Sequence, residues 1–281
     1  MAKKNNNELE EAKTTKDGYE IFLEKIKVDK EQFINWGVDA YSMPNEDKAK
    51  NEWDKLKKRI DDKRRKLNNE ENVYIRKYGR SEGSKELYID FYKEVFGLEI
   101  CTDPTNNKEP QEILKRLVAD ENKTNYINYQ VSHVWGKTKN MYMFSAPWNI
   151  MLIPKMFDPL TGHEAKGDLP RRFQKALRQK IYNKYRELII DYNKLIWDEY
   201  LNNEARREKC KKYYDKIEKK IKPKGNLGRI TNNMFKKFKI SIDSEFVMID
   251  KYGKTTTEKN NVEFPDAIEI NSIINTTSLN V

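Results

Sequence analysis

The sequence has little histidine, little cysteine and no long apolar run. Only 2 of its 281 residues are histidine and only 2 are cysteine. Cys101 and Cys210 lie far apart, so we expect neither a disulfide framework nor a cysteine-based zinc site. The first residues lack the apolar core of a signal peptide, and no stretch approaches the roughly eighteen apolar residues of a membrane span. These absences predict a cytoplasmic protein that is neither secreted nor membrane-bound.

The composition is nevertheless that of a folded protein. Charged residues make up 36% of the chain, a level often found in disordered proteins, but 16 Tyr, 11 Phe and 5 Trp supply large apolar side chains that disordered chains lack. A chain of this length can also bury a substantial core. We therefore expect a folded protein with a heavily solvated surface.

The positive charge is concentrated in one segment. The net charge is +10, and residues 171–224 contain eighteen Lys or Arg against eight Asp or Glu, a surplus equal to the net charge. Such a segment suits a polyanion, because each Lys or Arg that meets a phosphate releases condensed counterions. A lysine-rich helix can equally be a solvated face, so charge alone leaves both interpretations open.

Apolar spacing predicts a mostly helical α+β protein. Trp53, Leu56 and Ile60 recur at steps of three and four, and a similar pattern predicts one long helix over residues 173–200. We expect strands in "KFKISI", "EFVMIDKYGKTTTEKN" and "DAIEINSI". The expected organisation is a polar tail at 1–17, a helical N-terminal region at 18–126, a mixed core at 127–185, a basic helical extension at 186–224 and a small β-rich C-terminal region at 225–281.

Both histidines fall in one window. "YQVSHVWG", which contains His133, has the alternation of a strand, and "NIMLIP" is a short apolar strand that starts at Asn149 and stops at Pro154. A polar loop, "KTKNMYMFSAPW", joins the two. A turn-rich segment that contains His163 then leads into the long helix.

This order of residues resembles the HNH, or ββα-metal, nuclease core. That family has a histidine at the end of a first strand, an asparagine that opens a second strand, and an Asp, Asn or His after it that binds a divalent cation. The resemblance covers residues 127–185, about a fifth of the chain. It implies an embedded ββα-metal motif, followed here by a long helix and a small C-terminal β element.

The resemblance implies a role for each of these residues. His133 would be the general base that activates water, since a neutral imidazole suits proton transfer near neutral pH. The Asn149 amide would bond to the backbone across the loop and hold the orientation of the His133 ring. Asp158 and His163 would bind one divalent ion, Mg²⁺ or Mn²⁺, with Glu164 as a reserve ligand.

The implied substrate is double-stranded DNA. Lys137, Lys139, Arg171 and Arg172 would flank the cleft and hold phosphates, whereas Trp135 and Trp148 are interpreted as packing residues. A homodimer is expected if both strands are cut, because one motif contains one cutting centre. A restriction-type or phage-defence role is the expected context. No membrane partner is expected.

The sequence departs from the family at two places. Many HNH cores have Asp or His as a metal ligand directly before the catalytic histidine, and Ser132 occupies that position here. The pairs of zinc-binding cysteines that are common in the family are also absent.

Two alternatives stay open. Glu164 and Lys166 have the E-x-K spacing of PD-(D/E)xK nucleases, with Asp158 upstream, although the flanking residues are not strand formers. The second alternative is a non-catalytic nucleic-acid-binding or phage-related structural protein, in which His133 is an ordinary hydrogen-bonded residue. The sequence contains no P-loop, G-x-S-x-G, Rossmann or H-E-x-x-H motif.

Overall fold

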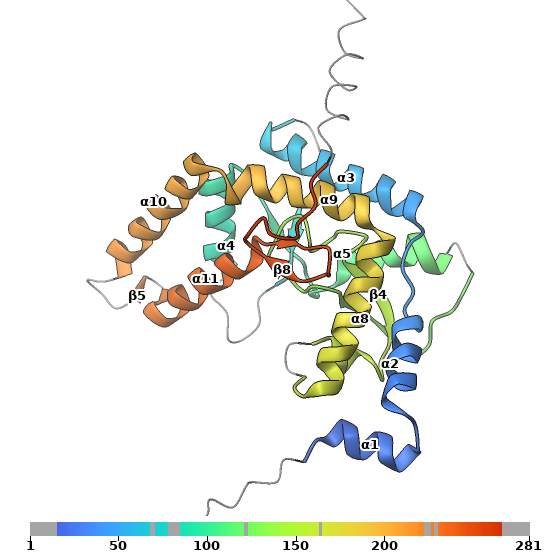
Figure 1. The fold of residues 1–281 in the computed structure, drawn as a ribbon. Coiled ribbons are helices and arrows are strands. Elements are labelled where there is room, and N and C mark those ends of the chain that lie inside the picture. The colour runs from blue at the N-terminus through green and yellow to red at the C-terminus, as the bar shows by residue number, and fades with distance from the viewer. Residues whose placement is uncertain are drawn as a thin grey trace, which may run out of the picture.

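The computed structural model describes residues 16–67, 71–77, 85–120, 123–162, 165–221, 226–227 and 230–265. Most of these residues are helical, and the strands among them form small two-stranded sheets (Figure 1). The expected class, mostly helical α+β, is therefore confirmed. Within the described ranges, no helix has the length and apolarity needed to cross a bilayer.

The first three helices begin at residues whose side chains cap the first turn. Asp17 accepts a hydrogen bond from the Tyr19 N–H, and Asp29 and Asn45 cap the next two helices in the same way. The third helix buries Trp53 and the residues that follow it at steps of three and four, as the spacing predicted. These helices are α1 (Gly18–Ile26), α2 (Lys30–Asp39) and α3 (Glu46–Arg64).

Two short helices follow, each of which continues into a π-helical turn. Asp103 fixes the start of the second one, because its carboxylate accepts hydrogen bonds from the N–H groups of Thr105, Lys108 and Glu109. The segment "CTDPTNNKEP" therefore forms a turn before this helix. The elements are β1 (Tyr74–Ile75), α4 (Lys85–Phe91), η1 (Tyr92–Phe96), β2 (Cys101–Thr102), α5 (Lys108–Leu114) and η2 (Lys115–Ala119), with β1 and β2 paired in parallel.

The two strands expected in the histidine window are confirmed. β3 (Tyr129–His133) and β4 (Ile150–Pro154) pair antiparallel, with His133 opposite Ile150. A short helix, α7 (Asp158–Thr161), follows and contacts β3. This pair of strands is where the sequence predicted the ββα-metal motif.

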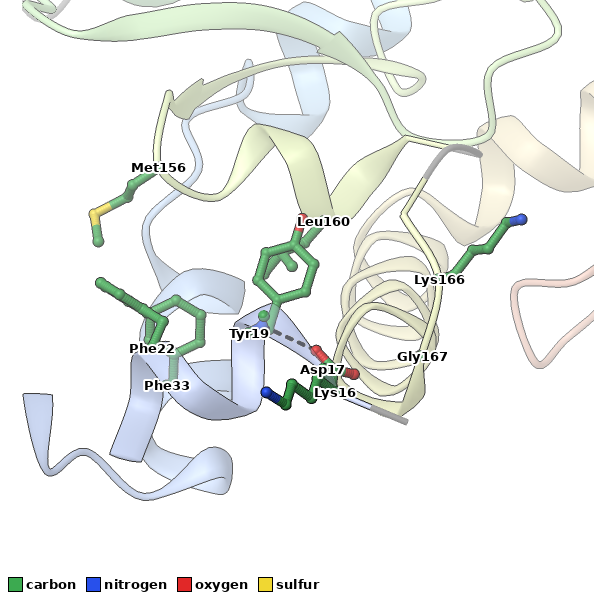
Figure 2. Close-up of a pocket in the computed structure, with 10 residues that line it drawn as sticks. Lys16, Asp17, Tyr19, Phe22, Phe33, Met156, Leu160, Lys166 and Gly167 are labelled. Atoms are coloured by element: carbon green, nitrogen blue, oxygen red, sulfur yellow. Dashed lines mark hydrogen bonds between the residues drawn. The ribbon is translucent and has the colours of Figure 1, made fainter. Parts of the chain in front are cut away.

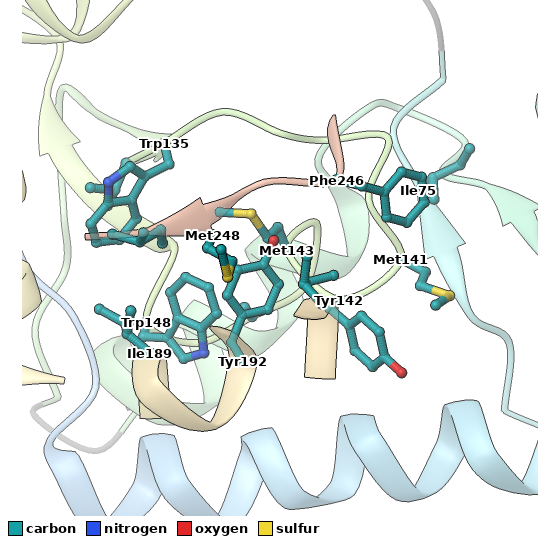
Figure 3. Packing of buried hydrophobic residues seen from close by; sticks show 14 of the residues in the cluster. Ile75, Trp135, Met141, Tyr142, Met143, Trp148, Ile189, Tyr192, Phe246 and Met248 are labelled. Carbon is teal, nitrogen blue, oxygen red and sulfur yellow. The ribbon is translucent and has the colours of Figure 1, made fainter. Parts of the chain in front are cut away.

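The connection between β3 and β4 differs from the expected polar loop. Residues 134–149 run through the interior, and Met141, Met143 and Trp148 are fully buried. Figure 3 shows these side chains packed with Tyr192 and Phe246 from distant parts of the chain. The prediction of a polar loop was wrong, because its few lysines and asparagines are outweighed by the area that these aromatic and thioether side chains bury.

The predicted long helix is present, but it is divided. Its apolar stripe, which includes Phe173, Leu177 and Ile181, is buried as expected. The α-helix is interrupted at Tyr185, whose backbone has φ −112° and ψ 30°. The elements are α8 (Asp168–Lys184), α9 (Arg186–Ile196), the π-helical turn η3 (Trp197–Leu201) and α10 (Glu204–Ile221). α9 lies beside α3, and the indole of Trp53 donates to Asp191 across the contact (Figure 1).

The C-terminal region is less β-rich than expected. "KFKISI" lies in α11 (Asn232–Glu245), which Thr231 caps and which buries Phe235, Phe238 and Ile242. The segment "KYGK" forms a turn between two short strands. "DAIEINSI" lies outside the described residues. The strands are β5 (Asn226–Leu227) paired with β6 (Ile230–Thr231), and β7 (Met248–Ile249) paired with β8 (Thr255–Thr256).

One hydrophobic cluster joins most of these elements. It runs from Leu23 of α1 to Ile249 of β7 and includes buried residues of the central loop, residues 134–149. In the described part of the chain, the regions that the sequence predicted one after another therefore share one hydrophobic core. The central loop lies inside this core, so its backbone is held in place on all sides.

Candidate active site

Asn149, directly before β4, ties the central loop together. The side chain is fully buried, and its Oδ1 accepts a hydrogen bond from the Trp135 N–H at 3.0 Å. Its Nδ2 donates to the carbonyls of Gly136 at 3.1 Å and Met143 at 2.8 Å. These are the hydrogen bonds across the loop that the sequence predicted for this amide. They hold both arms of the loop against the end of β3.

His133 has one ring nitrogen engaged and one available. Its Nε2 lies 3.0 Å from the Phe144 carbonyl, and the two rings stack with centroids 5.6 Å apart. Because a carbonyl only accepts, Nε2 carries the proton of the neutral ring. Nδ1 has no partner in the described part of the chain. Burial lowers the pKa of His133 to about 4, against the opposing effect of the Phe144 carbonyl, so the ring is neutral at pH 7.

His133 opens into a cleft of about 970 Å³. The cleft lies between β3, the start of the central loop, α7 and α8, with one wall from the end of α11. Its charged lining residues, besides the imidazole, come from five separate segments of the chain. They are Arg76, Lys137, Asp158, Arg178 and Glu245.

Burial lowers the pKa of two of the three cations that line this cleft. Burial lowers the pKa of Lys137, with Glu245 opposing the shift and Arg178 adding to it. Burial also lowers the pKa of Arg178, whose Nε donates to the Val134 carbonyl at 3.1 Å. Within the described ranges, Arg178 forms no ion pair. Lys137 and Arg178 are thus two partly desolvated cations around the single carboxylate of Glu245. Their positive charge suits this wall of the cleft to binding an anion.

Asp158 lies on the cleft wall at the start of α7. A pair of hydroxyls joins this helix to β3, because the Oγ of Ser132 lies 2.9 Å from the Oγ1 of Thr161, which in turn donates to the Asp158 carbonyl at 2.7 Å. Ser132, which replaces the expected acidic or imidazole ligand, thus holds α7 beside His133.

The predicted metal ligands fall only partly in the described chain. Asp158 lies in the cleft, but His163 and Glu164 lie outside the described residues. Among the residues that are described, no group of three or more His, Cys, Asp or Glu side chains is arranged to hold a metal ion. The metal site therefore stays a prediction, as does the alternative that involves Glu164 and Lys166.

Lys139 was expected to flank the cleft, and the structure corrects this. The side chain is 2% exposed, its Nζ donates to the Arg76 carbonyl at 2.9 Å, and it lies over the Tyr88 ring. Its backbone N–H donates to Glu245. A buried ammonium in these contacts cannot reach a phosphate, so Lys139 has a structural role.

Arg171 and Arg172 lie at the start of α8, outside the residues that line the cleft. Arg171 pairs with Asp168 at 2.6 Å, and Arg172 pairs with Glu31 of α2. Of the four cations predicted to hold phosphates, the structure places Lys137 alone in the cleft. Arg171 and Arg178, which are seven residues apart, lie on the same face of α8.

Three charged residues of the cleft were missed from the sequence. Helical spacing from Arg171 through Gln174 to Arg178 could have identified Arg178, since these positions share one face of α8. Arg76 and Glu245 gave no such signal. They reach the cleft through contacts between β1, α11 and the central loop, and local sequence patterns do not record such contacts.

The comparisons with known proteins identify a family. A match to the family described as "Uncharacterised protein PM1201" covers residues 44–251. "Uncharacterized protein PM1201" of Pasteurella multocida (strain Pm70) is 38% identical over 236 residues, which is 84% of this chain and 98% of that protein. No solved structure matches the chain. The chain therefore belongs to the PM1201 family.

Proposed function

We propose that this protein is a metal-dependent DNA endonuclease that hydrolyses phosphodiester bonds through an HNH-like ββα-metal motif at residues 127–185. One observation carries the proposal. In the cleft, His133 is neutral, its Nε2 proton is committed to the Phe144 carbonyl, and its Nδ1 is left to accept a proton. A neutral imidazole with one free ring nitrogen can accept a proton, as a general base does.

The proposed reaction uses the described side chains as follows. His133 Nδ1 removes a proton from water as the water attacks phosphorus. Arg178 and Lys137 hold the phosphate oxygens, on which negative charge increases in the transition state. The Asn149 amide acts by positioning, because it holds the loop that supplies the Phe144 carbonyl to the His133 ring.

Asp158 fits the metal that the motif implies. A carboxylate oxygen is a preferred ligand of Mg²⁺ and Mn²⁺, and Asp158 forms no ion pair within the described part of the chain. His163 and Glu164 follow it by five and six positions and complete the proposed donor set. A divalent ion there would stabilise charge on the phosphate and the leaving 3′ oxygen.

The proposed substrate is double-stranded DNA. α10 carries exposed cations, including Arg207, Lys209 and Lys212, which suit a long polyanion. Because one motif has one cutting centre, we include a homodimer in the proposal for cleavage of both strands. A restriction or phage-defence role is the proposed context.

A non-catalytic nucleic-acid-binding protein is the second candidate, and the same exposed cations of α10 favour it. The two candidates differ in their dependence on His133. A binding protein keeps its affinity for DNA when His133 is replaced and never cuts. A nuclease keeps much of that affinity but loses turnover.

The test incubates plasmid DNA with the full chain and Mg²⁺, Mn²⁺ or EDTA. We expect metal-dependent cleavage that falls about a thousandfold in His133→Ala, the range of a lost general base. Arg178→Gln should also lose most activity, whereas Arg171→Gln, on the same helix but outside the cleft, should retain it. Salt-sensitive binding without cleavage by the wild type would favour the second candidate.

A further inference from the structure

A second hollow, of about 600 Å³, lies beside the cleft. It is formed between α1 and the segments on either side of α7 (Figure 2). Tyr19 lines both this hollow and the cleft that contains His133, so the two share a wall. The apolar lining residues are Tyr19, Phe22, Phe33, Met156 and Leu160.

Aromatic surface in this hollow is open to solvent. Phe22 is 45% exposed and Met156 is 47% exposed. Phe33 lies behind Phe22, with ring centroids 6.4 Å apart, and packs on Phe157 at 5.1 Å, so the exposed ring rests on a fixed aromatic base. In Figure 2, Phe22 and Phe33 lie on one side of the hollow and Tyr19 with Leu160 on the other. Contiguous exposed apolar surface of this kind is typical of a binding site.

The edge of the hollow carries charges of both signs. Lys16, Asp17 and Lys166 line it, and neither lysine forms an ion pair within the described ranges. Asp17 Oδ1 caps α1 by accepting from the Tyr19 N–H at 2.9 Å, and the Lys166 side chain points away from Tyr19 and Phe22 in Figure 2. The hollow therefore offers ring faces inside and the ammonium of Lys16 at its edge. A nucleotide has the complementary chemistry, a flat aromatic base on an anionic backbone.

We propose that this hollow binds a nucleobase that has left the stack of a DNA strand held in the cleft. The inference rests on the proposed nucleic-acid substrate of the cleft and adds a feature of that substrate, an unstacked base. Stacking on Phe22 and Tyr19 would hold the base. Lys16 would hold a phosphate beside it.

A nucleobase fits this hollow better than a second copy of the chain does. A strand that leaves the cleft past Tyr19 reaches the hollow directly, because Tyr19 borders both.

The test measures binding in EDTA, so that no cutting occurs, with two duplexes of one sequence. Each carries a one-nucleotide bulge, and the bulged position is either a base or an abasic residue. We expect the full-length wild type to bind the bulged base roughly tenfold more tightly, the effect of one base–aromatic stack. Phe22→Leu, which keeps an apolar side chain but removes the ring, should bring the ratio near one. Phe22→Trp should preserve it.

Trp36→Leu is the matched control. Trp36 is 53% exposed and packs on Phe33, but it does not line the hollow, so its loss should leave the ratio unchanged. A ratio near one for the wild type, or a ratio that Phe22→Leu preserves, would overturn the inference. So would a wild-type dimer that Phe22→Leu converts to a monomer while the ratio stays fixed.

The two proposals can fail separately. Metal-dependent cleavage of plasmid together with a wild-type ratio of one would overturn the base site and leave the nuclease standing. A roughly tenfold ratio that depends on Phe22, without any cleavage, would support the base site and contradict the nuclease. Failure to bind either duplex, together with no cleavage of plasmid in the presence of metal, would overturn both.

Discussion

The central loop and helix α1 border neighbouring hollows, yet they are built in opposite ways. The loop at residues 134–149 is buried, and Asn149 satisfies its backbone groups from within. α1 buries Leu23 alone and exposes much of Ile21, Phe22 and Ile26. The buried central loop gives the cleft a rigid wall, which we call the frame and which suits catalysis. The exposed side chains of α1 give the hollow an open apolar face, which suits contact with a ligand.

The same division appears in the family match. That match begins at residue 44, so α1 and α2 precede it, while the described charged residues of the cleft, from Arg76 to Glu245, lie within it. The hollow combines the two parts, because Tyr19 and Phe22 come from the first and Met156 and Leu160 from the second.

The largest expected effect tests the rigidity of the frame. Asn149→Ala removes three hydrogen bonds and leaves buried backbone groups of Trp135, Gly136 and Met143 without partners. We expect the free energy of unfolding to fall by about 3 kcal/mol. Urea denaturation followed by circular dichroism measures it.

Asn51→Ala is the control for this change. Asn51 lies on the exposed face of α3, and alanine favours a helix, so its replacement should leave the stability within about 0.5 kcal/mol of the wild type. Equal effects of the two substitutions would show that the loop does not depend on the Asn149 amide.

An effect of similar size concerns pH. The pKa of His133 is about 4 in the folded chain and near 6.5 in the unfolded chain. Between pH 6.5 and pH 4, the unfolded chain binds a proton at His133 that the folded chain does not bind. The free energy of unfolding is therefore unaffected above pH 6.5 and falls as the pH drops toward 4. The loss should reach about 3 kcal/mol.

The measurement compares the stability of wild type and His133→Asn from pH 7 to pH 4. Carboxylates titrate in both proteins, so the difference between their slopes isolates the imidazole. Parallel curves would mean that the ring is solvated in the folded state and that the frame is looser than the buried hydrogen bonds indicate.

The smallest effect tests whether α2 is packed as tightly as the frame or is as open as α1. A Cβ at Gly37 would lie 2.7 Å from side-chain atoms of both Phe157 and Phe173, so Gly37→Ala should destabilise the protein by about 2 kcal/mol through overpacking. Gly18→Ala on α1 is the matched control, since no atom lies within 4 Å of the place that its new Cβ would occupy and the change should be neutral or slightly stabilising. Thermal unfolding measures both, and a neutral Gly37→Ala would place α2 with the open face.

Local patterns predicted the elements that have one clear period. Trp53, Leu56 and Ile60 identified α3, and alternation around His133 identified β3. "KFKISI" failed because it satisfies two periods at once, and the helical spacing from Phe235 to Phe238 to Ile242 decided the structure. A run of six residues cannot distinguish these periods.

The candidate site was predictable only where neighbours in sequence are neighbours in space. His133 and Asn149 sit at facing ends of one hairpin, so their order along the chain indicated their proximity. Arg76 and Glu245 arrive from segments that lie far away in the sequence. The buried state of Lys139 depends on those same distant contacts, and no local pattern encodes it.

The C-terminal turn between β7 and β8 has a consequence for synthesis. The carbonyl of Gly253 accepts a hydrogen bond from the Trp135 indole at 2.8 Å, and a Cβ at Gly253 would lie 2.9 Å from the backbone of Arg178. The Lys251 carbonyl accepts a hydrogen bond from Gln179. The turn therefore connects two sides of the cleft, and a ribosome adds it only after the residues that line the cleft, the last of which is Glu245. A chain that ends before residue 250 lacks this connection, so we expect its cleft to be less rigid than that of the full chain.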